Sequence, residues 1–242
     1  MSDTYVLVHG AWHTGAELEA VAAELRAAGH TVFCPTLAGN RVGDNRATCD
    51  LTGAVASLVE YIESRSLTAV RLVGHSYGGM VISGAAERLL PRLRRLVYVN
   101  AFVPLPGECL NDLVPAHYTA LFDAIAAEHD NAVMLPFPVW REAFINDADQ
   151  DLALLTYARL KPHPYRTFTE PSAMGRPLAE LAVGKSYVNC VLDTALPASL
   201  SWHPRLSERL GLFRYVESPG SHEAWFTEPV ALAAAIVRAG RD

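Results

Sequence analysis

Residues 69–79 constrain the fold more than any other part of this sequence. An apolar run leads directly into a Gly-x-Ser-x-Gly motif formed by Gly74, Ser76 and Gly78. The pattern is typical of a nucleophile elbow, a strained turn between a strand and a helix that presents a serine hydroxyl. The two glycines stand where a β-carbon would clash in so tight a turn. Ordinary glycine and serine turns share the motif, so the interpretation depends on partners found elsewhere in the chain.

Strand and helix patterns alternate around this motif. Strands are predicted at 5–9, 31–34, 69–73, 93–101, 186–192 and 212–216, and helices at 16–28, 51–64, 77–90 and 230–238. Strict alternation of this kind favours a parallel sheet covered by helices on both faces. The predicted fold class is α/β, with a mostly parallel sheet.

The alternation breaks down between residues 104 and 184, where prolines recur among helix-like segments that carry aromatic residues. We interpret 104–184 as a helical lid inserted into a core made of 1–103 and 185–242. Such a lid would lie over the carboxyl ends of the strands and select the substrate. Phe137 and Trp140 are candidate substrate-binding residues of this lid. Alternatively, its aromatic side chains form a small core of their own.

Composition narrows the class of protein further. The 242 residues carry a net charge of −6, the basic residues are scattered, and no apolar run reaches the ~20 residues of a membrane span. We therefore expect a soluble cytoplasmic protein that binds neither nucleic acid nor membrane. The four cysteines lack Cys-x-x-Cys spacing, so free thiols, buried at Cys34 and Cys190, are expected rather than disulfides or zinc. A homodimer is an expectation from the class of protein only.

The loop after the first strand, residues 9–13, is a candidate ligand-facing loop. In a nucleophile-elbow enzyme this loop supplies the second donor to the oxyanion, and a Gly10-Ala11 backbone can approach a substrate closely. Trp12 and His13 are candidate substrate-binding residues. Alternatively, His9 and His13 merely hydrogen-bond to neighbouring backbone. No carboxylate or cysteine follows at ligand spacing, so no metal is expected there.

An elbow serine needs a base and an acid that orients it. In this fold the chain order is serine, acid, histidine, and Asp193 and His222 follow the last two predicted strands. His203 is a rival base, but it lies in a helix-like segment, 202–210. Asp193 has an alternative role as a turn former. Asn100, after an earlier strand, is an amide and cannot carry the charge, while Glu217 and Glu170 remain rival acids.

Motifs spread over nearly the whole chain resemble those of the α/β-hydrolase group that includes plant methylesterases and hydroxynitrile lyases. They are Val6 to His13, the elbow with Gly79-Met80, Ala101 to Pro104, Asp151 to Leu154, Tyr187 to Asp193, Gly220 to His222 and Glu228-Pro229. The resemblance implies the α/β-hydrolase fold, a Ser76-His222-Asp193 triad, an oxyanion hole formed by the Ala11 and Tyr77 amides, and no cofactor.

The resemblance leaves three functions open. The leading hypothesis is hydrolysis of an ester of a small, apolar or aromatic molecule through an acyl-enzyme. The others are a lyase or other non-hydrolytic catalyst on the same triad and a ligand receptor with a slow triad. Hydroxynitrile lyases of the group carry threonine after the first loop histidine and lysine after the catalytic histidine, where this chain has Gly10 and Glu223. We expect the Glu223 carboxylate to repel a cyanide leaving group, unless Glu223 is a solvated residue that points away.

Overall fold

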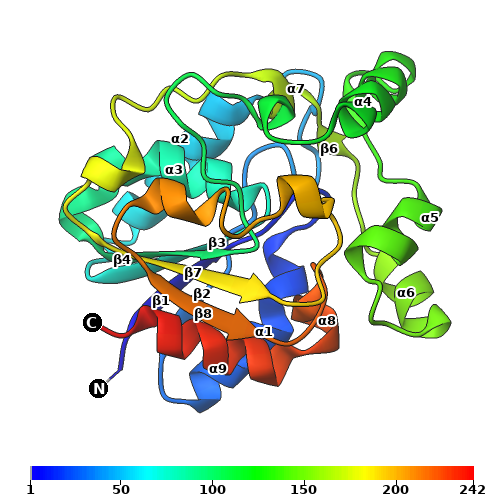
Figure 1. Ribbon diagram of the computed structural model, residues 1–242. Coiled ribbons are helices and arrows are strands. Elements are labelled where there is room, and N and C mark those ends of the chain that lie inside the picture. The colour runs from blue at the N-terminus through cyan, green and yellow to red at the C-terminus, as the bar shows by residue number, and fades with distance from the viewer. Residues whose placement is uncertain (1) are drawn as a thin grey trace.

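The computed structural model describes residues 2–242 and is organised around one parallel sheet (Figure 1). Within these residues the sheet has six strands in the order β2-β1-β3-β4-β7-β8, and every neighbouring pair is parallel. The strands are β1 Thr4–Val8, β2 Thr31–Phe33, β3 Val70–His75, β4 Leu93–Val99, β7 Gly184–Cys190 and β8 Arg214–Ser218. The predicted α/β fold is confirmed.

Helices cover both faces of the sheet. Figure 1 shows α2 and α3 on one face and α1 and α9 on the other. Their bounds are α1 Glu19–Ala27, α2 Leu51–Ser64, α3 Gly78–Leu89 and α9 Pro229–Gly240. Each face has its own hydrophobic cluster, with Leu58 and Val81 in one and Leu25 and Ile236 in the other. A sheet buried on both faces explains why its strands read as continuous apolar runs in the sequence.

The insertion between β4 and β7 lies beyond the carboxyl ends of the strands (Figure 1). It contains α4 Ala116–Glu128, α5 Phe137–Val139, α6 Gln150–Tyr157, α7 Arg166–Thr169 and an antiparallel pair, β5 Ala132–Val133 with β6 His163–Pro164. Its last part returns along α3, where Gly175 N–H donates to Glu87 at 3.0 Å. The predicted boundaries at 103/104 and 184/185 stay a prediction.

Short helical turns complete the chain. They are η1 Gly15–Leu18, η2 Leu90–Arg92, η3 Leu110–Asp112, η4 Trp140–Phe144, η5 Leu178–Glu180, η6 Ala198–Leu200, η7 Ser207–Leu210 and α8 Ala224–Thr227. The helix-like segment expected at 202–210 is thus only a turn followed by η7. Cys190 is buried, but Cys34 is half-buried, and all four cysteines are free. Across residues 2–242, no helix combines the length and apolar character needed to cross a membrane.

Candidate active site

Ser76 occupies the sharp turn between β3 and α3. Its backbone φ is +53°, a left-handed conformation that is unfavourable for a residue with a β-carbon. A β-carbon added to Gly78 would lie 2.7 Å from the Val8 carbonyl oxygen, so only glycine lets α3 approach β1 this closely. The Ser76 carbonyl accepts hydrogen bonds from Gly79 at 3.0 Å and Phe102 at 3.1 Å. These contacts hold the strained turn in place.

His222 and Asp193 meet at the carboxyl edge of the sheet. Asp193 follows β7 and His222 follows β8, and His222 Nδ1 donates to Asp193 Oδ2 over 2.6 Å. Both side chains are 1% exposed. Burial is the largest single influence and would lower the pKa of His222, but the charge and hydrogen bond of Asp193, together with Glu223, raise this pKa above its ordinary value. Because Nδ1 is occupied, Nε2 is the nitrogen available to accept a proton.

Asn100 is a site residue that the sequence argument dismissed. Its Nδ2 donates to Asp193 Oδ2, and its Oδ1 accepts from Cys190 N–H at 2.7 Å. Its φ of +37° is a conformation that asparagine tolerates better than most residues. Asn100 therefore cannot replace the acid, but it holds the acid's oxygen. Its place at the end of β4, beside the strand that precedes Asp193, is the signal that could have revealed it.

Ser76 and His222 open onto one cavity of about 380 Å³. The predicted oxyanion residues Ala11 and Tyr77 line it, as does Trp12. Its other walls are Phe102, Leu110, Val114, Tyr118, Phe122, Phe144, Phe168, Ala195, Leu196 and Trp202. The cavity thus combines two polar residues of the proposed triad with walls that are almost entirely apolar.

Three of the four predicted substrate-binding residues do not line this cavity. Phe137 packs against Tyr157 with ring centroids 5.2 Å apart, and Trp140 is fully buried within the lid. His13 is buried beneath the loop that Ala11 and Trp12 belong to. Phe137 and Trp140 are therefore packing residues, and Trp140 also contacts His13 and Phe226 outside the lid. Other lid aromatics, which no periodic pattern distinguished, take the wall positions instead.

The loop after β1 divides its side chains between the cavity and the interior. The Trp12 indole lines the cavity and donates to the Val133 carbonyl at 3.0 Å, and its φ is +64°. His9 Nδ1 lies 2.8 Å from the Gly10 carbonyl oxygen, and His13 Nδ1 lies 2.6 Å from that of Ala11. The two histidines are thus bound to neighbouring backbone, as the alternative interpretation expected.

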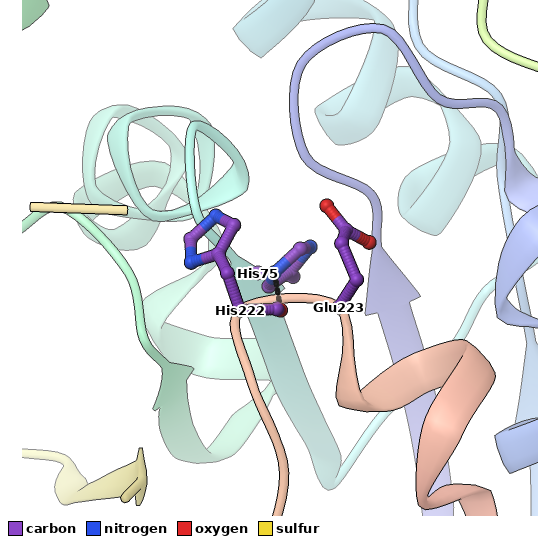
Figure 2. A group of neighbouring side chains, drawn as sticks. All are labelled: His75, His222 and Glu223. Atoms are coloured by element: carbon purple, nitrogen blue, oxygen red, sulfur yellow. Dashed lines mark hydrogen bonds between the residues drawn. The ribbon is translucent and has the colours of Figure 1, made fainter. Parts of the chain in front are cut away.

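Glu223 differs from both sequence-based interpretations. It is 2% exposed, so it is not solvated, and burial raises its pKa to about 8. At neutral pH it is mainly an uncharged carboxylic acid, and the expected repulsion of cyanide by a carboxylate is wrong. Figure 2 shows its carboxyl group beside His75 and His222, pointing toward the loop after β1.

A ligand atom from each of His75, His222 and Glu223 lies within 4.8 Å of the others, a spacing that could hold a metal ion. However, His222 Nδ1 is engaged by Asp193, and His75 Nε2 donates to the His222 carbonyl at 3.0 Å. An acid with a raised pKa is a poor ligand for a cation, because a ligand must give up its proton, and His222 needs its remaining nitrogen as the proposed base. We interpret the group as a cluster of buried polar side chains.

The rival residues lie elsewhere. His203 Nδ1 pairs with Ser207 Oγ at 2.6 Å, and its ring packs on Tyr215. Glu217 is exposed. Glu170 accepts from the Thr52 N–H and hydroxyl, both at 2.8 Å. None of the three rivals lines the cavity of Ser76.

Comparison with known proteins identifies the family of this chain. The sequence profile described as "Alpha/beta hydrolase family" matches residues 5–235. The chain belongs to the alpha/beta hydrolase family. A solved extracellular alpha/beta-hydrolase from a Paenibacillus species, described as sharing homology with tobacco salicylic acid binding protein 2, is 35% identical. It covers 99% of this chain and 100% of its own, with a TM-score of 0.95.

Curated relatives agree with the predicted group. Salicylic acid-binding protein 2 of Nicotiana tabacum is 27% identical over 96% of this chain and 95% of its own length. A carbendazim hydrolyzing esterase of Nocardioides sp. is 42% identical, over 55% of this chain and 60% of its own length. The chain thus spans less than two thirds of that esterase. The resemblance to the plant methylesterase group is confirmed, and the chain is an esterase-type α/β hydrolase.

Proposed function

We propose that this protein is a carboxylesterase that hydrolyses uncharged esters of small aromatic acids. The observation that carries the proposal is the shared cavity of Ser76 and His222, walled by aromatic side chains. Only about 30 Å³ of this cavity is free for a water-sized molecule, and large side chains surround it, which favours a small substrate. Apolar walls provide no partner for a charged acyl group, so they disfavour one.

The proposed reaction has two halves. Ser76 Oγ attacks the ester carbonyl carbon and gives its proton to His222 Nε2, while the Ala11 and Tyr77 amides bind the oxyanion. The carbon–oxygen bond to the alcohol then breaks, and the alcohol leaves with the proton from His222. A water molecule, deprotonated by His222, releases the acid and restores Ser76. Asp193 would keep His222 in the required tautomer and stabilise its charged form.

The names of relatives also support ester chemistry on aromatic molecules. The relatives include a carbendazim hydrolyzing esterase, a pyrethroid hydrolase and a salicylic acid-binding protein. Those names describe ring-containing molecules, and the aromatic cavity walls of this chain suit such groups.

A fluorophosphonate probe tests the proposal, because it forms a stable bond only with an activated serine. We expect one adduct by intact mass on the parent and none on Ser76→Ala. The same pair is then assayed with nitrophenyl acetate, benzoate and palmitate. Benzoate should give the highest kcat/KM. An unlabelled parent without turnover would instead support the ligand-receptor alternative.

A further inference from the structure

Glu223 and His13 form a buried polar pair that the proposed mechanism does not use. Glu223 Oε2 lies 3.5 Å from His13 Nε2, and the two side chains are 2% and 4% exposed. His13 Nε2 has no hydrogen-bond partner, although it is shielded from solvent. A buried nitrogen without a partner is costly, so this contact requires an explanation.

The hydrogen bond on the other side of the ring fixes the tautomer of His13. Nδ1 lies 2.6 Å from the Ala11 carbonyl oxygen, which can only accept, so Nδ1 carries the proton. Burial lowers the pKa of His13 to about 4, and the ring is therefore neutral at pH 7. Nε2 then presents a lone pair to Glu223. A carboxylate would repel that lone pair, whereas a protonated carboxyl group can donate to it.

We propose that Glu223 is a positioning residue whose protonated carboxyl group donates to His13 Nε2, so that His13 holds the Ala11 carbonyl and the oxyanion loop. The inference rests on the proposed esterase function. Ala11 lines the catalytic cavity, and the next residue, Trp12, is held at a φ of +64°. A loop with a strained tryptophan needs such an anchor, because relaxation of Trp12 would move the Ala11 amide.

The charged groups around Glu223 favour its protonated form. Burial contributes most to raising its pKa to about 8, and the carboxylates Asp193, Asp147 and Glu17 add to this, while His222 acts in the opposite direction. Asp193 and His222 face it from the loops after β7 and β8, Asp147 from the lid, and Glu17 from η1. His75, on β3, is also in the cluster, and burial lowers its pKa well below the ordinary value.

Ionisation of Glu223 should therefore lower activity at alkaline pH. A serine-histidine pair alone gives a kcat/KM that rises as His222 loses its proton and then stays level. In the parent we expect kcat/KM to fall again as pH rises through about 8, the pKa of Glu223 in the free enzyme. The decline should appear in kcat rather than KM, because the oxyanion forms only during the reaction.

Two substitutions at position 223 separate the donor from the charge. Glu223→Gln supplies an amide N–H that donates to His13 at every pH, so it should retain activity near pH 7 within about threefold and lose the alkaline decline. Glu223→Met keeps the size and removes the donor, and its kcat should fall by about tenfold. Glu217→Gln, at an exposed glutamate, is the matched control and should follow the parent profile.

A readout that does not depend on turnover distinguishes failure of this proposal from failure of the esterase proposal. Nitrogen-15 chemical shifts of His13 report both its tautomer and any hydrogen bond accepted at Nε2. The Ala11 carbonyl should keep the Nδ1–H tautomer in the parent and both variants. The Nε2 resonance should show an accepted hydrogen bond in the parent and in Glu223→Gln but not in Glu223→Met. An active parent whose alkaline decline persists in Glu223→Gln overturns the positioning role, as does a His13 Nε2 resonance that is the same in the parent and in Glu223→Met. A parent without turnover overturns the esterase function alone if the shifts follow the expectation.

Discussion

The surroundings of the proposed triad fall into two parts of opposite chemistry, which we call the front and the rear. In front, Ser76 and His222 face a cavity with aromatic and aliphatic walls. At the rear, the buried side chains of His13, His75 and Glu223 form a polar group, the rear cluster. An apolar front excludes water and selects the acyl group, whereas a polar interior can fix the dipoles that the reaction needs. Substrate choice and the arrangement of the catalytic groups therefore depend on different residues in this protein.

The largest expected effect comes from removing the nucleophile between the two sides. Ser76→Ala should lower kcat for a benzoate ester by about a millionfold, because triad losses in serine hydrolases are of this order. Ser76 is 7% exposed and its turn is held by backbone contacts, so the fold should survive. Circular dichroism and thermal melting check the fold. Retention of most of the activity would exclude Ser76 as the nucleophile.

The acid is next in expected effect. Asp193→Asn keeps the shape but removes the charge and allows the wrong His222 tautomer, so kcat should fall by about a thousandfold or more. Glu217→Asn, at the rival exposed glutamate, is the comparison. Steady-state assays of both variants identify the acid. A near-normal Asp193→Asn together with an inactive Glu217→Asn would reverse the assignment.

The rear cluster should also be visible in stability. The folded state keeps a proton on Glu223 up to a pKa of about 8, whereas the ordinary value is 4.5. Between these pH values the unfolded chain binds fewer protons, so this group's contribution to stability is full below about 4.5 and is lost as pH rises to about 8. Its slope is about 1.4 kcal/mol per pH unit.

Replacement of Glu223 by glutamine removes its contribution to the dependence of the free energy of unfolding on pH. Urea unfolding of the parent and of Glu223→Gln at pH 5.5, 6.5 and 7.5 should show the parent losing stability relative to the variant. The cavity-wall variant Phe122→Ala serves as a control, because its stability difference from the parent should not change over this range. Parallel pH curves for the parent and Glu223→Gln would contradict a raised pKa at Glu223.

A smaller effect, on selectivity between esters, is expected from the cavity wall at the front. Phe122 lines the cavity, while Phe137 packs on Tyr157 outside it. Phe122→Ala should lower the ratio of kcat/KM for benzoate over acetate esters by about tenfold, since one apolar contact is worth ~1–3 kcal/mol in discrimination. Phe137→Ala should leave the ratio unchanged. An equal change in both variants would mean that the lid acts through its stability and not through the cavity wall.

Sequence reasoning predicted the sheet and the chain order of the proposed triad because these features are local. Ser76, Asp193 and His222 each follow an apolar strand, and the elbow at Ser76 has its own motif. Burial of Glu223 could not be predicted this way, because the residues around it come from the loop after β1, β3, β7 and the lid. The same holds for Phe122 and Phe137, whose opposite locations depend on how the lid folds.

The smallest effect expected is the absence of cyanohydrin cleavage. A cyanide leaving group develops negative charge, which needs a nearby cation. Within the described residues, the cavity of Ser76 is lined by no lysine or arginine. Position 223, where the related lyases carry lysine, holds a buried acid with a pKa of about 8. At neutral pH that acid neither repels nor stabilises cyanide, so the electrostatic part of the prediction depends on the absence of a cation from the cavity wall.

The loop after β1 gives a second reason to expect no cyanohydrin cleavage. A β-carbon added to Gly10, where the lyases carry threonine, would lie 3.1 Å from Ser76 Cβ and 3.0 Å from His75 Nδ1. A threonine at this position would therefore require His75 and Ser76 to move by a few tenths of an ångström, which would disturb the nucleophile. We expect mandelonitrile cleavage at the buffer rate, beside measurable hydrolysis of nitrophenyl benzoate. Cyanide release above that rate, lost in Ser76→Ala, would show that the apolar front supports a charged leaving group without a cation.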